Sequence, residues 1–364
     1  MVFAQASGTA ANAWEYVSQY LPHLLWTYLQ GNLITVLGVV FALLVVGRLL
    51  IEKRAPSNIF AWGLFILFIP LLGVPLYFIF GGRKSRRLVR KKQEIQRMAY
   101  RLITGKEPAL PDDPGGTPPA LPRVTHFQNS FELLGDSTAT FKTFLRKIAH
   151  AKKHIYIQTY ILGKDRVSRT VLARLAEKAR EGVQVLLLYD AVGSRRAWKQ
   201  TRALREAGGR VVRFAPSLLN FKWSVSANLR NHRKIAIFDG TQAIIGGQNL
   251  EVAGMGPHHR KEVNVDFSAL IGGPVVGTLT RTFVSDWCFA AEQAPESFAE
   301  QISYVPPPAG ETILEAIASG PDLAGDVLWE RILLLIASAQ ETCTLITRTS
   351  SPTRSPSATS NSRP

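Results

Sequence analysis

Residues 231–249 read NHRKIAIFDGTQAIIGGQN, in which polar residues at fixed spacing border two short apolar runs. Both runs contain isoleucine, a β-branched residue that is typical of buried strands. Asp239 and Gly240 lie between the runs and form a strong turn signal, so the stretch predicts a β-hairpin. On the first strand of this hairpin His232 and Lys234 are two residues apart, and their side chains should therefore point to the same face.

A histidine and a lysine on one strand face suit phosphoryl transfer. A neutral imidazole can attack phosphorus and form a covalent intermediate, and an ammonium group can neutralise charge that builds on a non-bridging oxygen. Asn249 follows the second run after two glycines and provides a further donor for the same oxygens. The alternative is a basic, solvated strand end with a structural turn behind it. The added Gly-Gly-x-Asn sequence makes a chance match to H-x-K-x4-D less frequent and favours the catalytic interpretation.

The spacing of His232, Lys234 and Asp239 resembles the HKD motif of the phospholipase D superfamily. RNHRKIAIFDG followed by GGQN is similar to the first HKD motif of bacterial cardiolipin synthases. The resemblance implies two-step covalent catalysis, in which one motif histidine forms a phosphohistidine and the histidine of a second motif protonates the leaving alcohol. It also implies that two phosphatidylglycerol molecules give cardiolipin and glycerol, without a metal or an organic cofactor.

The same resemblance implies a role for each residue of the motif. His232 is the nucleophile or the general acid, Lys234 and Asn249 bind the phosphate, and Asp239 is a structural orienter. Asp266 falls on the acidic position that orients a histidine in the family, although Asn and Val replace the Trp and Arg that usually precede it. The alternative for Asp266 is a solvated carboxylate at the start of a strand.

The charge of the chain is strongly positive, with a formal net charge of +16 at pH 7. This balance favours anionic partners, either membrane lipid or nucleic acid. Residues 83–92 (RKSRRLVRKK) hold seven basic residues directly after an apolar segment, which favours lipid headgroups. The run lacks the aromatic residues on which single-stranded nucleic acid stacks. Cys288 and Cys343 lie in no pattern of metal ligands, which argues against a zinc site or a disulfide framework.

Two apolar runs, residues 33–51 and 59–80, follow an N-terminal segment of residues 1–30. Each run is close to the roughly 20 residues that cross a bilayer, so residues 31–82 are expected to form a two-span transmembrane anchor; two buried core helices are the alternative. The stretch also resembles the two-span N-terminal module of many cardiolipin synthases. Because the basic residues follow the second span, we expect a bacterial plasma (inner) membrane protein with its soluble domain in the cytoplasm.

The chain after the apolar runs divides into a linker and an α/β domain. Residues 83–123 are first basic and then rich in Pro and Gly, as in a linker. Residues 124–295 alternate strand and helix signals, as expected of a phospholipase D-like α/β domain. Gly193-Ser194 is interpreted either as a ligand-binding loop after a strand or as a plain turn. Helices are expected near 141–153, 168–180 and 196–207, and strands at 154–161, 183–190 and from 209 onward.

An internal repeat begins near the end of the chain. Residues 332–347 repeat the helix and strand signals of residues 144–159, but the counterpart of His232 would fall beyond Pro364. We therefore expect residues 296–347 to be the start of a truncated second half. The final residues, RTSSPTRSPSATSNSRP (348–364), are expected to form a disordered tail.

The motif at His232 leaves three functional hypotheses. The first is a cardiolipin synthase-type phosphatidyltransferase, impaired by the missing second motif unless a homodimer brings two copies of His232 together. The second is a non-catalytic membrane protein that binds lipid phosphate. The third is a phospholipase D-type phosphodiesterase in which water is the acceptor.

Overall fold

A single sheet of eight strands organises the described part of the chain. The computed structural model describes short pieces of residues 19–47, and then residues 56–80, 83–104, 125–195, 197–214, 230–256, 266–319 and 327–344. The strand order is β4-β3-β2-β5-β6-β7-β1-β8. The strands are β1 (Thr125–Leu134), β2 (His154–Thr159), β3 (Gln184–Asp190), β4 (Arg210–Phe214), β5 (Ile235–Phe238), β6 (Gln242–Gly246), β7 (Ser268–Gly272) and β8 (Thr312–Glu315).

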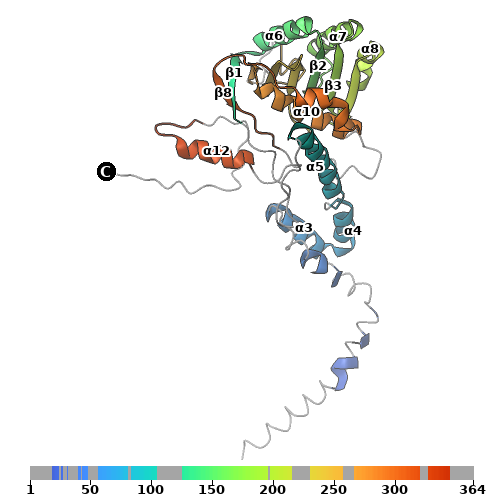
Figure 1. The fold of residues 1–364 in the computed structure, drawn as a ribbon. Coiled ribbons are helices and arrows are strands. Elements are labelled where there is room, and N and C mark those ends of the chain that lie inside the picture. Colours follow the sequence, from blue (N-terminus) through green and yellow to red (C-terminus); the bar gives the residue numbers. More distant parts are fainter. Residues whose placement is uncertain are drawn as a thin grey trace, which may run out of the picture.

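Helices cover both faces of this sheet (Figure 1). Strands β2, β3 and β4 are parallel, and the strands from β5 to β8 pair antiparallel with their neighbours. The helices are α3 (Pro56–Phe68), α4 (Pro70–Phe80), α5 (Arg83–Thr104), α6 (Ser137–His150), α7 (Arg166–Arg180), α8 (Arg202–Glu206), α10 (Val275–Ala291), α11 (Ala299–Ser303) and α12 (Val327–Ser338), with short 3-10 helices η1 (Ala197–Thr201) and η2 (Pro295–Phe298).

Alternate residues of the central strands fill two separate cores. On β3, Val185 and Leu187 pack with α6 and α7, whereas Leu186 and Leu188 pack with α10. Because both faces of the strand are buried, its sequence is a continuous apolar run rather than an alternating one. The observed layers confirm the predicted α/β class, and they place the central strands β2, β3 and β5 between two layers of helices.

The predicted hairpin is confirmed. β5 and β6 pair antiparallel, and Phe238 lies opposite Gln242. Asp239 and Gly240 in the connection have φ angles of 52° and 69°, the left-handed conformation that glycine adopts at little cost. The strand is shorter than expected, because β5 begins at Ile235 and the motif histidine and lysine precede it.

The second apolar run is not one continuous helix. It forms α3 and α4, which are separated at Ile69, because Pro70 has no N–H and disfavours a helical residue before it. A Cβ atom on Gly73 would come within 2.8 Å of the Ile66 Cα atom, so α4 packs closely on the end of α3. Over the residues that the structure describes, no helix has both the length and the apolar character needed to span a bilayer. Most of the first run, residues 33–51, lies outside those residues.

The basic stretch that was expected to open a linker is instead part of the domain. Arg83–Thr104 form α5, which packs against α10 and α11. Ile95 and Ala99, four residues apart, are buried in the core beside α10. The stripe of apolar residues thus holds this helix on the sheet layer, although its sequence is mostly basic. The Pro- and Gly-rich remainder, residues 106–122, lies outside the described residues.

The start of the expected second half also belongs in part to the first domain. Phe298 and Ile302 are buried in the core beside α10, and β8 extends the sheet by pairing with β1. By contrast, α12 is largely exposed, with Leu334 and Leu335 51% and 59% exposed. Residues 339–344 form no strand, and the predicted tail at residues 348–364 lies outside the described residues.

Candidate active site

The candidate site lies at the carboxyl ends of the parallel strands β2 and β3, where α/β folds commonly bind ligands. β5 runs antiparallel to β2 with Ile235 opposite Gln158, so the residues just before β5 reach this edge. His232 and Lys234 are in this position, and Tyr160 follows β2 beside them. The site is therefore built by a short loop before β5 and the exit of β2.

The motif histidine and lysine approach the same aromatic ring. The imidazole of His232 stacks on Tyr160, with 3.8 Å between ring centroids and 19° between planes. The Nζ atom of Lys234 lies 5.6 Å from the centroid of the Tyr160 ring and donates to the backbone oxygen of His232 at 2.8 Å. The two side chains thus lie on one side, as predicted, although neither belongs to the strand. Sequence reasoning missed Tyr160, because an aromatic residue next to an apolar run is usually interpreted as part of the hydrophobic core.

The surroundings of His232 favour its neutral form. Burial lowers the pKa of the imidazole, and the nearby cations Lys234 and Arg230 lower it further, while Asp190 acts in the opposite direction. The net effect is a pKa below the ordinary value of histidine. Because the histidine is also exposed, a neutral ring with an accessible face is present at neutral pH, as a nucleophile requires.

Lys234 lies in a field of two carboxylates. Burial lowers the pKa of its ammonium group, and Asp266 and Glu251 oppose this effect. Asp266 is thus close enough to act on Lys234 electrostatically. Gly247 makes room for it, since a Cβ atom there would collide with the Asp266 carboxylate. Among the described contacts, the carboxylate of Asp266 accepts from the backbone N–H of Phe267, and none joins it to His232.

Asn249 is fixed next to the same strand exit. Its Oδ1 atom accepts a hydrogen bond from the backbone N–H of Ile161 at 3.1 Å. Leu250 forms a parallel bridge with Leu162, so the end of the Gly-Gly-x-Asn segment pairs with the chain that follows Tyr160. With its oxygen engaged in this way, Asn249 keeps its Nδ2 amide group as a hydrogen-bond donor.

The loop at Gly193-Ser194 supports the site from within. Ser194 is buried, and its hydroxyl donates to the backbone oxygen of Tyr160 at 3.0 Å and accepts from the N–H of Leu162 at 2.8 Å. Of the two interpretations of this loop, the structure favours a structural one. It fixes the segment that carries the aromatic ring under His232.

Asp239 lies at the opposite end of β5 from His232. Its carboxylate accepts hydrogen bonds from the backbone N–H groups of Lys152, Lys153 and His154 at 2.7–3.1 Å. Burial alone would raise the pKa of Asp239, but these three donors outweigh it and hold the pKa below the ordinary range. The strand between the two motif residues spans roughly 13 Å at about 3.3 Å per residue, so Asp239 orients the scaffold and does not reach the site.

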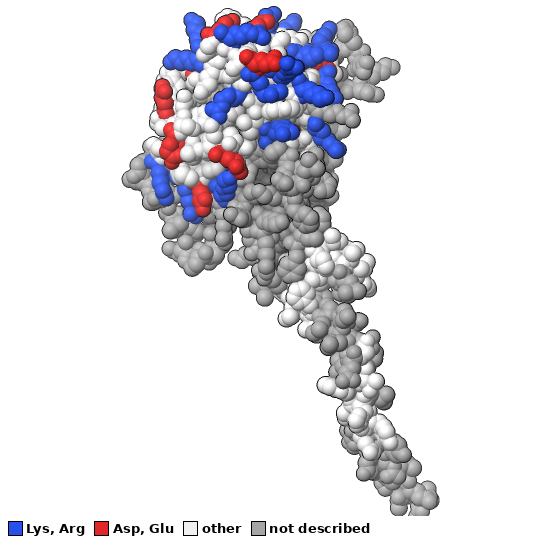
Figure 2. Space-filling view, turned by 90° about the vertical axis from the view of Figure 1, so that its right-hand side faces the viewer, with Lys and Arg blue, Asp and Glu red and all other residues white. Residues whose placement is uncertain are grey.

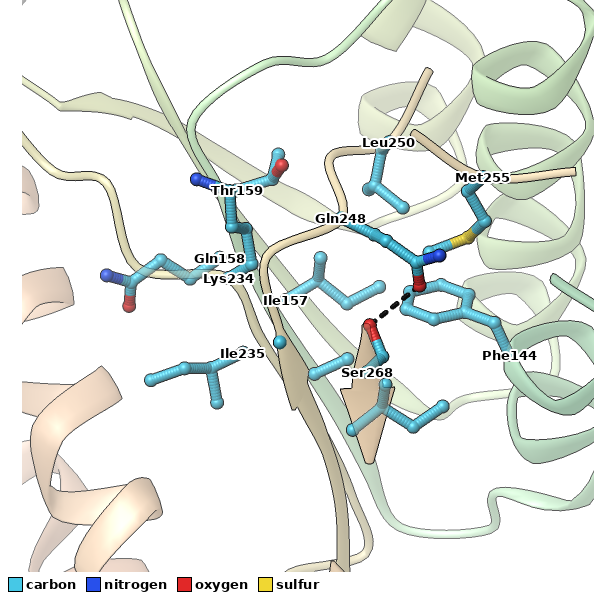
Figure 3. Close-up of a pocket in the computed structure, with 13 residues that line it drawn as sticks. Phe144, Ile157, Gln158, Thr159, Lys234, Ile235, Gln248, Leu250, Met255 and Ser268 are labelled. Carbon is cyan, nitrogen blue, oxygen red and sulfur yellow. Dashed lines mark hydrogen bonds between the residues drawn. The ribbon is translucent and has the colours of Figure 1, made fainter. Parts of the chain in front are cut away.

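A small cavity lies beneath the motif (Figure 3). Its volume is about 20 Å³, which suits about one water molecule and excludes a lipid headgroup. The buried Gln248 accepts a hydrogen bond from Ser268 at 2.8 Å across it, as Figure 3 shows. The cavity therefore leaves no room for a substrate beneath His232. Among the residues that the structure describes, no group of three or more His, Cys, Asp or Glu is arranged to hold a metal ion.

The sequence is similar to known families over two of its stretches. Residues 144–287 match the family described as "Cardiolipin synthase, PLD-like domain", and residues 37–82 match "Phospholipase_D-nuclease N-terminal". Over residues 144–287 the chain is thus similar to the phospholipase D-like domain of cardiolipin synthases. The family match covers the motif, Tyr160 and most of α10, but it ends before β8.

Individual relatives extend over most of the chain. It is 31% identical over 338 residues to a cardiolipin synthase of Alkalihalophilus pseudofirmus, which covers 86% of this chain and 65% of the relative. It is also 31% identical to cardiolipin synthase A of Pseudomonas entomophila, covering 91% of this chain and 66% of the relative. The chain thus spans just under two thirds of the length of these relatives. A solved phospholipase D family member, Nuc from Salmonella typhimurium, matches 45% of this chain and 95% of its own at 15% identity, with a TM-score of 0.34, which is too slight a likeness to carry an inference.

Proposed function

We propose that this chain carries a catalytic half-site of a cardiolipin synthase-type phosphatidyltransferase. The observation that supports the proposal best is the pairing of an exposed, neutral His232 with Lys234 over the ring of Tyr160. A ring nitrogen of His232 attacks the phosphorus of phosphatidylglycerol, and the bond to the glycerol oxygen breaks. A proton passes to that oxygen, and glycerol leaves. The hydroxyl of a second phosphatidylglycerol then displaces the histidine, loses its proton and forms cardiolipin.

The roles of the neighbouring residues follow from their positions. Lys234 and the Nδ2 group of Asn249 bind non-bridging oxygens, where negative charge builds during the displacement. Asp266 acts on Lys234 and keeps its ammonium group charged in a partly buried site. The lowered pKa of His232 keeps its ring neutral, as the attacking histidine requires.

The two-step reaction needs a general acid as well as a nucleophile, and we propose a homodimer as the source of the second catalytic histidine. A homodimer that brings two copies of His232 together would supply both. Turnover should then rise with the square of the chain concentration in dilute detergent, and dilution to monomers should abolish it.

We further propose that the chain is bound to a bacterial plasma membrane by residues 31–82 in two spans, with its domain in the cytoplasm. Apolar side chains of α3 and α4 are unusually exposed, including Phe60 at 69% and Phe68 at 77%. Exposed aromatic and aliphatic residues in such number mark an interaction surface. Figure 2 shows Lys and Arg, with some Asp and Glu among them, on the upper part of the domain, and the net charge of +16 favours an anionic lipid such as phosphatidylglycerol.

The experiment that tests the proposed function traps the covalent intermediate. The full chain in membranes is incubated with phosphatidylglycerol labelled in its phosphate, and acid-labile label on the protein is measured. We expect label on the wild type and on the control variant His150→Ala, whose histidine is exposed and bonded to its own helix. His232→Ala should lose the label.

The products separate the three hypotheses. Cardiolipin marks a transferase, and phosphatidic acid marks a phosphodiesterase with water as acceptor. Binding to phosphatidylglycerol vesicles with neither label nor product marks a lipid-binding protein. Equal labelling of wild type and His232→Ala would overturn the catalytic assignment.

A further inference from the structure

A buried carboxylate on α10 lies behind the motif. Asp286 is 1% exposed, and its Oδ2 atom accepts hydrogen bonds from Gln158 at 2.7 Å, Asn231 at 2.9 Å and Arg233 at 2.6 Å. Its Oδ1 atom lies 2.7 Å from the ammonium group of Lys92. These five residues, here called the Asp286 cluster, join β2, the loop before β5, α10 and α5.

Two members of the Asp286 cluster stand directly on either side of the motif histidine. Asn231 precedes His232 and Arg233 follows it, and both bind the same carboxylate oxygen. The side chain of Asn231 also accepts from the backbone N–H of Arg233 at 3.0 Å, which closes the loop on itself. Because the backbone is held at both neighbours, the direction of the His232 side chain toward Tyr160 depends on Asp286.

The fourth partner arrives from a distant part of the sequence. Lys92 belongs to α5, which begins three residues after the apolar helix α4 ends, and its side chain is 4% exposed. The rings of Phe214 and Phe289 lie 5.7 Å and 5.9 Å from its ammonium group. Figure 1 shows α5 running from α4 to the helix layer of α10. The ion pair of Lys92 and Asp286 thus links the Asp286 cluster to α5, the helix that follows the proposed membrane anchor.

The charges of the Asp286 cluster depend on one another. Burial alone would raise the pKa of Asp286. The cations of Lys92 and Arg233 outweigh this effect and hold the pKa well below the usual range of a carboxylate. Removing one partner of a buried ion pair leaves the other charge without compensation. Loss of Lys92 would therefore leave Arg233 as the main cation of Asp286 and change the bond that fixes the loop.

We infer that Asp286 is a positioning residue that couples the docking of α5 to the orientation of His232. The inference rests on the proposed function, since it assigns a purpose to the orientation of that histidine. The coupling works in a defined direction. When α5 is docked, Lys92 completes the cluster and the loop holds His232 against Tyr160. When α5 is displaced, the loop loosens and the imidazole becomes more solvated.

The experiment measures the reactivity of His232 directly, so it needs no turnover. The full chain in detergent is treated with diethyl pyrocarbonate between pH 5 and 8, a range that spans the ordinary titration of histidine. Modification of His232 is then quantified by peptide mass spectrometry, and folding is followed by thermal unfolding. The variants are Lys92→Met and Asp286→Asn, with Lys92→Arg as the variant that retains the cation. The matched control is Lys91→Met, which removes an exposed ion pair with Glu292 between the same two helices.

We expect Lys92→Met and Asp286→Asn to raise the modification rate of His232 by about threefold or more, the scale at which members of one hydrogen-bonded network are coupled. The pH midpoint should rise toward that of a free histidine, because solvation removes the effect of burial. Lys92→Arg should recover part of the wild-type profile, and Lys91→Met should match the wild type. If Asp286→Asn does not fold, the two Lys92 variants decide the question.

Two outcomes would overturn the inference. One is a folded Lys92→Met chain whose His232 profile equals that of Lys91→Met. The other is a control that changes the profile as much as the cluster variants do, since the effect would then reflect general loosening of α5. A chain that takes up no label from phosphatidylglycerol but shows the expected profiles would contradict the proposed function and leave the coupling intact.

Discussion

The two ends of β5 carry different residues of one sequence motif, and the surroundings of the two ends differ. At the start of the strand, His232 and Lys234 lie beside Tyr160, and the histidine is exposed. At its end, Asp239 receives three backbone N–H groups and lies in a tight turn. A motif that is contiguous in sequence is therefore divided in space into a reactive end and a supporting end. Spacing identifies the members of a motif, but only the strand geometry separates their tasks.

Lys234→Met tests the reactive end most severely. The change keeps most of the apolar stem and removes the charge, so labelling of the chain by phosphatidylglycerol should fall about 10²- to 10³-fold, as for loss of one donor to a developing oxyanion. Thermal unfolding should change little. Lys147→Met is the matched control, because Lys147 binds Gln242 near the supporting end. Equal labelling of Lys234→Met and Lys147→Met would contradict the distinction between a reactive and a supporting end of β5.

Asp239→Asn tests the supporting end. Asparagine tolerates the left-handed conformation, but the charge that binds three N–H groups is lost, and we expect a cost of about 1–3 kcal/mol in the free energy of unfolding by urea. Because the folded pKa of Asp239 is lowered, its contribution is present above the unfolded pKa and is lost as the pH falls through the folded value. The difference between wild type and variant should therefore shrink in acid. A folded variant with strongly reduced labelling of His232 would place Asp239 in the chemistry instead.

Gly240→Ala should act more weakly at the same end. A side chain at a φ of 69° costs about 1 kcal/mol, and urea unfolding should show this loss with no change in labelling of His232. Gly135→Ala is the control, since a Cβ atom there meets nothing within 4 Å and its φ is not in the left-handed region. Equal stability of the two variants would contradict the strained turn.

The smallest expected effect is a shift in the titration of His232. Burial and the cation of Lys234 lower its pKa, so its modification by diethyl pyrocarbonate should persist to a lower pH in the wild type than in Lys234→Met. The same peptide from the two chains allows the two pH midpoints to be compared directly. A higher midpoint for the wild type would show that the reactive end favours the charged imidazole.

Continuous apolar runs made the central strands predictable. β2, β3 and β5 are buried on both faces, and each contains a continuous apolar run: IYI in β2, VLLLY in β3 and IAIF in β5. The motif residues were recognised by their spacing together with the Gly-Gly-x-Asn sequence that follows them. β1 was not, because its burial is irregular and its partners β7 and β8 are far away in sequence. α5 was missed because basic residues surround its apolar stripe.

Sequence reasoning also missed the residues that support the site. Tyr160 and Asp286 belong to no local pattern, and each gains its importance from contacts with residues far along the chain. An aromatic residue after a strand and an acid inside a helix are both common. Their partners are chosen by the packing of α10 against the sheet, which no spacing within one segment reveals.

The central place of β5 in the sheet has a consequence for motion. Hydrogen bonds to β2 on one side and β6 on the other mean that its amides are freed only when two ladders break together. Amide hydrogens of Ile235–Phe238 should thus be among the last to exchange with deuterium, whereas those of α12 should exchange early. His232 would then be attached to a strand that rarely opens, while other parts of the molecule open more often.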